Sequence, residues 1–230
     1  GARYQAMEFM GEALQHLDMS DRFSMANMAI EAGAKAGLFE ADEMTRSFIR
    51  ARGREDGLYL QSDPDAEYAA VYEFDVSEFE PFVAVPFIPE NVKPVSQLNE
   101  VEIDQAVIGM CTNGNLEDLR AAAEILKGHQ IHPRVRAVII PGSQKVYLDA
   151  LREGLIEIFI QANCSVSTPT CGPCLGGHMG VLAAGEKCIS TSNRNFRGRM
   201  GHTSSELYLA NPYVAAASAI AGRIISPDDL

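Results

Sequence analysis

Apolar residues recur at helical spacing along the first part of the chain. The spacing predicts a helix over residues 2–17, a second over 22–37 that stops at Gly37, and a third that starts near Asp42. Residues 70–86, AVYEFDVSEFEPFVAVP, instead alternate apolar and polar side chains, as half-buried strands do. The pattern therefore predicts helices that give way to strands.

Beyond residue 100 the pattern becomes a regular alternation of elements. The segments QAVIGM at 105–110 and VRAVIIPG at 135–142 are typical of buried strands, each followed by an amphipathic helical pattern, and IEIFIQA at 156–162 continues the alternation as a strand. Short apolar strands separated by helices predict an α/β fold with a parallel sheet covered on both faces. Loops at the carboxyl ends of such strands form the ligand site.

The segment between the two patterns predicts a domain boundary. Residues 86–104 carry three of the eleven prolines and show no periodicity. With 230 residues, of which 47% are hydrophobic, the chain is long enough for two modest domains. We therefore expect one domain over 1–95 and a second over 96–230.

Charge and composition exclude several classes of function. The net charge is −12 and lysines and arginines form no cluster, so we expect no nucleic-acid partner. The longest apolar runs, such as LIEIFI, are far shorter than the ~20 residues that span a bilayer, so we expect no membrane partner. Five cysteines without a secretory signal pattern fit a reduced, cytoplasmic protein.

Cys111 lies where a predicted strand ends and a predicted helix begins, with Thr112 and Asn113 as potential caps of that helix. A thiol near a helix N-terminus has a lowered pKa and suits a metal or a nucleophilic role. The alternative is a small buried residue at a strand end, which is common for a lone cysteine.

The stretch STPTCGPCLGG brings Cys171 and Cys174 within reach of one metal or of each other. A redox dithiol is disfavoured because the glycines after Cys174 oppose an immediate helix and the chain has no tryptophan. A zinc site is a second reading, and the candidates for its fourth ligand are His178, Cys164, His132 and Cys188. The third reading joins Cys111, Cys171 and Cys174 as ligands of an iron-sulfur cluster with one open iron.

The run STSNRNFRGR at 190–199 points to a small acidic substrate. Guanidinium groups bind carboxylates through two parallel hydrogen bonds. Arg194 and Arg199 belong to a turn-prone segment in which Asn193 and Asn195 can form local hydrogen bonds. The alternative is that these arginines pair with carboxylates on the surface of an acidic protein.

Asn27 and Glu31 are spaced i,i+4 in a helical pattern of mostly small or apolar residues. Glu31 is either a hydrogen-bonded structural carboxylate or an acid/base group that faces a cleft.

Taken together, these stretches resemble the aconitase superfamily, in particular the large subunits of the isopropylmalate dehydratase and homoaconitase group. The resemblance covers nearly the whole chain. It is carried by motifs that keep the family's order and spacing, namely NMAIEAGAKAG, CTNG followed by LEDLRAAAEIL, PTCGPCLGG, CISTSNRNFRGRMG and ELYLANPYVAAASAIAGRI.

The resemblance implies three-layer α/β domains with mostly parallel sheets, and a [4Fe-4S] cluster held by Cys111, Cys171 and Cys174. The iron without a protein ligand coordinates the hydroxyl and carboxylate of the substrate as a Lewis acid. The remaining positions implied for the site are Arg194 and Arg199 for the substrate carboxylates, Asn193 beside the cluster, and Asn27 with the catalytic Glu31 facing the substrate.

The reaction implied is a hydro-lyase isomerisation of 2-isopropylmalate and 3-isopropylmalate, a step of leucine biosynthesis. The chain lacks the His and Asp-Ser-His motifs of the family's N-terminal half, so we interpret it as the C-terminal part of a large subunit and expect it to be inactive alone. The resemblance also implies a separate small swivelling subunit that carries the proton-abstracting serine. Departures from the family pattern are Met110, Gly114 and Asn115, next to the first cluster cysteine.

Overall fold

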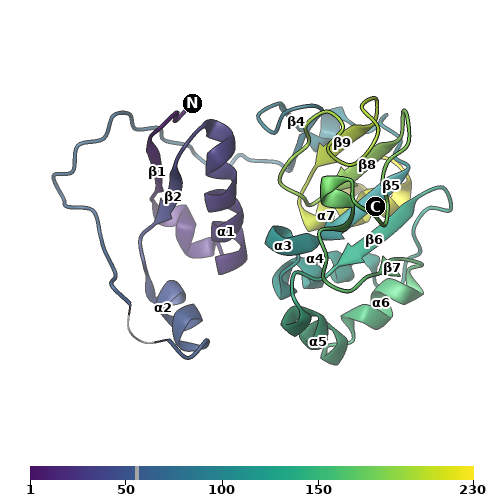
Figure 1. Cartoon of the computed structure of the whole chain (residues 1–230), viewed down its shortest axis with the longest axis horizontal. Helices are drawn as coiled ribbons and strands as arrows, with labels where there is room; N and C mark the ends of the chain where they lie inside the picture. Colours follow the sequence, from purple (N-terminus) through teal and green to yellow (C-terminus); the bar gives the residue numbers. More distant parts are fainter. Residues whose placement is uncertain (55–56) are drawn as a thin grey trace. The chain divides into compact units, whose positions relative to one another are not determined.

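The computed structural model describes residues 1–54 and 57–230, which form two compact units, Gly1–Phe79 and Glu80–Leu230 (Figure 1). Each unit has its own sheet, with two strands in the first and seven in the second. The division differs from the expected boundary after residue 95, because residues 82–94 already contribute two strands to the sheet of the second unit. The proline-rich segment is therefore part of a domain rather than a linker.

The first unit is small and is built around two parallel strands. Its elements are β1 (Ala6–Phe9), η1 (Glu12–His16), α1 (Met19–Met28), η2 (Ala29–Ala32), β2 (Ala36–Phe39) and α2 (Glu43–Arg50). β1 pairs with β2 in parallel from Ala6↔Ala36 to Phe9↔Phe39, and the rings of Phe9 and Phe39 stack with centroids 4.9 Å apart.

In this unit one helix prediction is wrong, and another is confirmed only in its first part. Residues 2–17 form a strand and a 3-10 turn instead of one helix, because β1 pairs with β2 and Gly11, at φ 111°, separates the two elements. The second predicted helix forms as α1 over Met19–Met28 and continues as the 3-10 turn η2, which ends at Gly33 with φ 83° and not at Gly37. Gly37 lies in β2, where a Cβ atom would approach the Cα of Ala26 to 2.8 Å, so it permits close packing of strand and helix.

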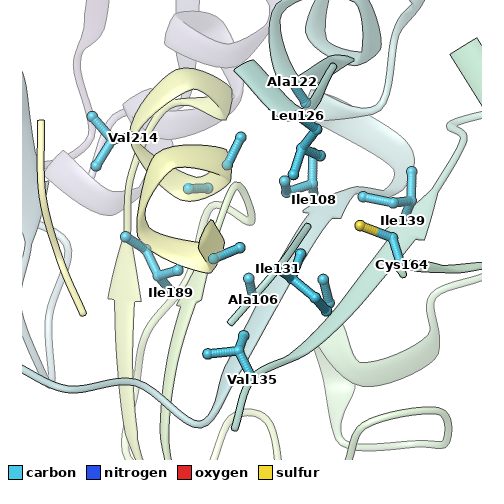
Figure 2. Close-up of a cluster of buried hydrophobic side chains, with 14 of the residues drawn as sticks. Ala106, Ile108, Ala122, Leu126, Ile131, Val135, Ile139, Cys164, Ile189 and Val214 are labelled. Carbon is cyan, nitrogen blue, oxygen red and sulfur yellow. The ribbon is translucent and has the colours of Figure 1, made fainter. Parts of the chain in front are cut away.

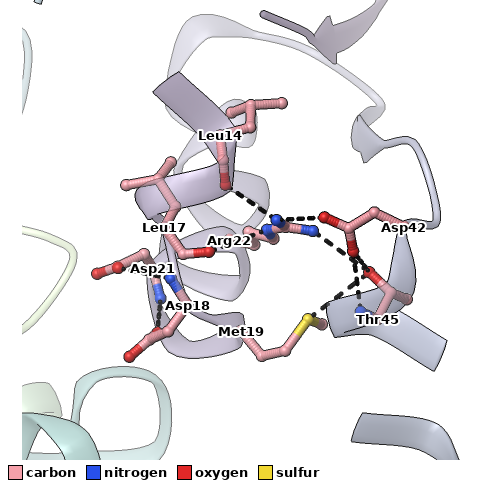
Figure 3. A network of polar contacts seen from close by, with 8 residues as sticks. All are labelled: Leu14, Leu17, Asp18, Met19, Asp21, Arg22, Asp42 and Thr45. Atoms are coloured by element: carbon pink, nitrogen blue, oxygen red, sulfur yellow. Dashed lines mark hydrogen bonds and ion pairs between the residues drawn. The ribbon is translucent and has the colours of Figure 1, made fainter. Parts of the chain in front are cut away.

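A buried arginine connects the helices of the first unit (Figure 3). Arg22, 3% exposed, donates from Nη2 to Oδ2 of Asp42 at 2.7 Å and to the carbonyl of Leu14 at 2.9 Å. Asp42 also caps α2 by accepting from the backbone N–H of Thr45 at 2.9 Å, which confirms the predicted helix start. The Arg22 guanidinium holds the pKa of the Asp42 carboxyl well below its usual range.

The strands predicted over residues 70–86 form only in part. β3 (Phe82–Ala84) is the one segment of that range with strand structure in the part that the structure describes. Residues 57–81 contain no helix or strand, and Figure 1 draws them as a long coil. The apolar side chains of residues 71–79 are exposed, so the alternation seen in the sequence does not pack on a sheet formed by the described residues.

The second unit carries the main sheet. Its elements are β3, β4 (Val92–Pro94), η3 (Val95–Gln97), β5 (Gln105–Gly109), α3 (Met110–Asn113), α4 (Leu116–Leu126), β6 (Arg136–Ile140), α5 (Gln144–Arg152), α6 (Leu155–Gln161), β7 (Ser165–Val166), η4 (Gly172–Leu175), β8 (Lys187–Ser190), β9 (Glu206–Leu209), α7 (Pro212–Ala221) and η5 (Pro227–Asp229). The strand order is β4-β3-β9-β8-β5-β6-β7. Neighbouring strands pair in parallel across β9, β8, β5, β6 and β7. β3 pairs antiparallel with β4 on one side and with β9 on the other. The predicted α/β fold with a mostly parallel sheet is therefore confirmed.

Alternate residues of each central strand face two different layers. Ile108 and Ile139 pack with α4, α6 and α7 in the larger core, where Leu126 and Val214 also lie (Figure 2). Val107 faces the opposite side, where loop residues such as Met200 cover the sheet. The sheet is thus covered on both faces, by helices on one and mainly by loops on the other. The loop layer carries the cysteine motif, since Cys174 packs at its margin.

The segment IEIFIQA is helical, so the predicted strand over 156–162 is wrong. It lies in α6, and the following strand is β7. A short apolar run is compatible with a buried strand or with a buried helix segment, and periodicity does not separate the two. Phe159, fully buried in the larger core, shows that tertiary packing selected the helix.

Among residues 1–54 and 57–230, the structure has no helix with both the length and the apolar character required to cross a membrane.

Candidate functional site

The residues singled out in the second unit follow the ends of parallel strands. Cys111 comes after β5, Cys171 after β7, and Asn193 after β8. Because these strands are parallel, their carboxyl ends lie at one edge of the sheet. The site predicted at this edge therefore has its three segments after β8, β5 and β7; β8 and β5 are adjacent, and β6 lies between β5 and β7.

Cys111 is held by a tight turn between β5 and the short helix α3. Gly109 has φ 116° and Met110 has φ 74°, a region that L-residues with side chains rarely adopt. A Cβ atom on Gly109 would lie 2.0 Å from the carbonyl oxygen of Ile140, and one on Gly114 would lie 2.4 Å from that of Met110. Both glycines are therefore required, and the Cys111 thiol is exposed on the turn that they form.

The predicted capping of the following helix by Thr112 or Asn113 is wrong. Both residues lie inside α3, and Asn115 caps α4. Asp118 completes the cap, because its Oδ2 accepts from the backbone N–H of Asn115 at 2.9 Å. The departure from the family pattern at Asn115 thus has a local structural role.

The Cys-Gly-Pro-Cys segment forms one 3-10 turn. η4 follows Cys171, with the backbone N–H of Cys174 donating to the carbonyl of Cys171 at 3.0 Å, and it ends at Gly176 with φ 71°. The glycines thus limit the helical structure to a single short turn. Both cysteines are free thiols, Cys171 exposed and Cys174 half-buried.

The candidate fourth ligands of a zinc site are engaged elsewhere. His178 is exposed, with its Nε2 2.9 Å from Oγ1 of Thr170. His132 accepts at Nδ1 from the backbone N–H of Arg134 at 3.2 Å. Cys164 and Cys188 are buried in the two hydrophobic cores, and burial raises the pKa of each thiol to about 12.

Within the described residues, no group of three or more His, Cys, Asp and Glu side chains is placed to hold one metal ion. The arrangement at the strand ends is therefore an edge with three separate accessible thiols rather than a closed site for a single ion.

Arg199 lies beside the cysteine motif. Its Nη2 donates to Sγ of Cys174 at 3.8 Å, and its buried Nε has no hydrogen-bond partner among the described residues. The two loops approach closely, since a Cβ atom on Gly176 would lie 3.3 Å from the backbone nitrogen of Gly201. A guanidinium in this position would stabilise a thiolate, and any anion bound next to it, by placing a positive charge beside them.

A second polar group connects the Cys111 turn to the segment after β8. Nδ2 of Asn113 donates to Oδ1 of Asn193 at 2.7 Å and also to the carbonyl oxygen of Thr191. Oγ1 of Thr191 accepts from the backbone N–H of Gly109 at 2.8 Å. The sequence analysis did not assign Asn113 or Thr191 to the site. Thr191 directly follows β8, which is a signal that could have identified it, whereas Asn113 is the last residue of α3 and was considered only as a helix cap.

The other residues of the 190–199 run differ in their surroundings. Arg194 is half-buried, and its Nη1 donates to the carbonyl oxygen of Asn193 at 3.4 Å. Asn195 is fully buried and donates from Nδ2 to the carbonyl of Val85 at 2.9 Å, so it anchors the loop to the strand region instead of facing a ligand. Arg197 is exposed and stacks over the ring of Phe87 at 4.0 Å.

Asn27 and Glu31 belong to the first unit and do not share one α-helix. α1 ends at Met28, and Glu31 lies in the 3-10 turn η2 that follows. Asn27 is exposed and Glu31 half-buried. Their expected roles in a site stay predictions.

The second unit is thus an α/β domain with three cysteines, each at least partly exposed, after the ends of parallel strands. Comparison with known proteins assigns the family. The model of the aconitase family (aconitate hydratase) matches residues 1–101 and 92–222. The chain belongs to the aconitase family.

Within the family, the chain is similar to proteins named "3-isopropylmalate dehydratase large subunit". It is 60% identical over 230 residues to those of Hydrogenobaculum sp. (strain Y04AAS1) and Moorella thermoacetica, and 58% identical over 235 residues to that of Aquifex aeolicus. All of this chain is covered in each comparison, but only 54%, 55% and 54% of the respective relative. The chain thus spans about half the length of the curated relatives it matches.

Proposed function

We propose that this chain is part of the large subunit of a 3-isopropylmalate dehydratase, a hydro-lyase that interconverts 2-isopropylmalate and 3-isopropylmalate by dehydration and rehydration. The observation that carries this proposal is the 60% identity, over the whole chain, to relatives of that name. Those names favour isopropylmalate over the homoaconitase substrates that the sequence pattern left open.

The cofactor that fits the residues is a [4Fe-4S] cluster held by Cys111, Cys171 and Cys174. Each thiolate of such a cluster binds a different iron, so the ligands need not converge on one point as they do around zinc. These three thiols lie after strand ends and are at least partly exposed, whereas Cys164 and Cys188 are buried with raised pKa values. When bound, the cluster supplies a Lewis-acidic iron toward the hydroxyl and carboxylate of the substrate.

The chain's own residues bind and orient the substrate. Arg194 and Arg199 are the charged donors of the loop after β8, and two guanidinium groups suit a substrate with two carboxylates. Asn193 accepts a hydrogen bond from Asn113 at 2.7 Å, which fixes its amide next to the short helix α3 that contains Cys111. Their contribution is orientation together with electrostatic stabilisation of charge that develops on the substrate.

The first unit supplies the remaining predicted groups. Glu31 is the candidate acid/base residue and Asn27 the candidate substrate donor, and both depend on docking of this unit in the complete enzyme. We expect the chain to act in the cytoplasm together with the rest of the large subunit and a small subunit, because the matched relatives are twice as long and are named large subunits. Five free cysteines suit a reducing compartment.

Anaerobic reconstitution with iron and sulfide tests the proposal. We expect about four irons and four sulfides per chain. Cys111→Ala should lose the cluster, whereas the matched control Cys164→Ser should keep it because that thiol lies in the core. The reconstituted chain alone should not turn over isopropylmalate, and addition of the missing large-subunit part and the small subunit should restore turnover. Stoichiometric zinc, or a reversible disulfide between Cys171 and Cys174, would contradict the proposal.

A further inference from the structure

The most exposed apolar stretch of the described chain alternates like a strand but pairs with none. Tyr72, Phe74 and Val76 are 80%, 74% and 49% exposed, and Glu73 and Asp75 lie between them. In an extended chain these two sets point to opposite sides, one apolar and one acidic. Residues 70–77 nevertheless have no strand partner among the described residues.

A segment with this pattern lacks the neighbouring strand and the packing surface that would stabilise it. Aromatic and β-branched residues with period-two alternation are suited to a half-buried sheet position, and an unpaired extended backbone offers its N–H and C=O groups to a neighbouring strand. The start of the segment is anchored in its own unit, because Tyr68 Oη donates to Oε2 of Glu8 at 2.7 Å and Ser62 Oγ to Oε1 of the same carboxylate at 2.8 Å. Among the described residues, those from 69 to 78 form no side-chain hydrogen bond to another element, and Glu80 accepts from Ser96 at 2.9 Å.

The sheet of the first unit also has fewer strands than a parallel sheet normally needs to be stable. β1 and β2 form a parallel pair of four residues each. Parallel sheets occur almost only with more strands and with both faces covered, and a two-stranded sheet is marginal by itself. The strands and surfaces that complete this unit must come from another chain segment, and the matched relatives contain about as much sequence again as this chain.

We propose that residues 70–77 form a strand that adds to a sheet edge in the part of the large subunit that this chain does not contain. The apolar side chains Tyr72, Phe74 and Val76 pack on that part, and Glu73 and Asp75 face solvent. This inference rests on the proposed function only in taking the uncovered part of a large subunit as the partner. Strand addition obtains its affinity from main-chain hydrogen bonds and its specificity from alternate side chains, which is what this segment offers.

Co-expression with the uncovered part of the Aquifex aeolicus large subunit, tagged for affinity purification, tests the proposal. We expect the chain to co-purify and the amides of residues 71–77 to exchange hydrogen at least about tenfold more slowly in the complex than in the chain alone. Phe74→Asp places a charge on the buried face and should reduce co-purification about tenfold or more. Ser77→Asp adds the same charge on the acidic face and should bind like the unchanged chain.

Three results would overturn the proposal: no complex, a complex in which residues 71–77 exchange as fast as in the free chain, or equal binding by the two Asp variants. Circular dichroism of both variants separates a folding defect from a docking defect. Iron and sulfide are measured in the same samples, so that failure of the strand and failure of the cluster are distinguished. If the chain binds iron and sulfide but the amides of residues 71–77 exchange rapidly in the complex, only the strand proposal is refuted. If those amides are protected from exchange but no iron and sulfide are bound, only the cofactor assignment is refuted.

Discussion

The guanidinium of Arg199 donates to the sulfur of Cys174 at 3.8 Å, although 25 residues separate them along the chain. This contact joins the loop after β8 to the cysteine turn and brings a positive charge to a thiol that the proposed cluster uses as thiolate. Hydrogen bonds to charged groups are worth about 1.5–3 kcal/mol, so we expect Arg199 to help retain the proposed cluster in addition to its proposed role in substrate binding.

Arg199→Gln is therefore expected to accelerate loss of the reconstituted cluster in air by roughly tenfold, because the charge-assisted donor to Cys174 is removed. The decay of cluster absorbance with time measures this. Arg197→Gln is the matched control in the same loop, since Arg197 stacks on Phe87 and has no contact with the cysteines in the described residues. Equal decay rates for both variants would show that Arg199 acts on the substrate alone.

Thiol labelling should separate four of the five cysteines into two classes, with the half-buried Cys174 between them. Cys111 and Cys171 are exposed and should react with iodoacetamide in the native apo chain, whereas Cys164 and Cys188 should react only after unfolding. With a pKa of about 12, only roughly one in ten thousand of the two buried thiols is ionised at pH 8, and the reagent does not reach them. Mass spectrometry of tryptic peptides reads each site, and native labelling of Cys188 would contradict the structure.

Gly109→Ala tests the turn that presents Cys111. The new Cβ would lie 2.0 Å from the Ile140 carbonyl oxygen, so either β6 or the turn must shift. Gly128→Ala is the matched control, because Gly128 also has positive φ, at 81°, but has nothing within 4 Å of an added Cβ. We expect Gly109→Ala to lose about 2–3 kcal/mol more unfolding free energy than the control, and to bind less iron. Urea denaturation gives the difference, and equal losses would mean that only the backbone conformation matters.

Asp42→Asn tests the buried arginine of the first unit. Asparagine keeps the helix cap but removes the charge opposite Arg22, so stability should fall by about 1–2 kcal/mol at pH 7, a value already reduced for the partial exposure of Asp42. The folded-state pKa of Asp42 is lowered, so its contribution is full above the usual value of 3.8 and is lost as pH falls through the lower, folded-state value.

The difference in melting temperature between the unchanged chain and Asp42→Asn should therefore stay constant from pH 7 to about pH 5 and become smaller below about pH 4. The control is Glu43→Gln, whose ion pair with Arg50 is solvent-exposed and whose loss should leave the melting temperature unchanged. A gap that widens in acid would show that Asp42 does not stabilise the fold as a carboxylate.

Much of the second unit follows from local sequence. The strand 105–109, the helix 116–126 and the strand 136–140 lie where periodicity and apolar runs predict them, and their order gives the parallel sheet. The placement of Cys111, Cys171 and Asn193 at one edge follows as well, since parallel strands end on the same side. The motifs, with their order and spacing, were enough to indicate the family, which the match to the aconitase family model confirms.

What the sequence misjudged are segments whose conformation depends on distant partners. Residues 6–9 became a strand only because residues 36–39 lie beside them, and residues 156–161 became a helix because Phe159 fills the core under α4. Residues 70–77 have the alternating pattern of a strand but belong to no sheet, because the described residues provide no surface for their apolar side chains to pack on. The sequence by itself determined the α/β class, the strand ends and the cysteine set. Only the tertiary structure decided which cysteines are accessible and which arginine reaches one of them, because burial and hydrogen bonding depend on segments brought together from far along the chain.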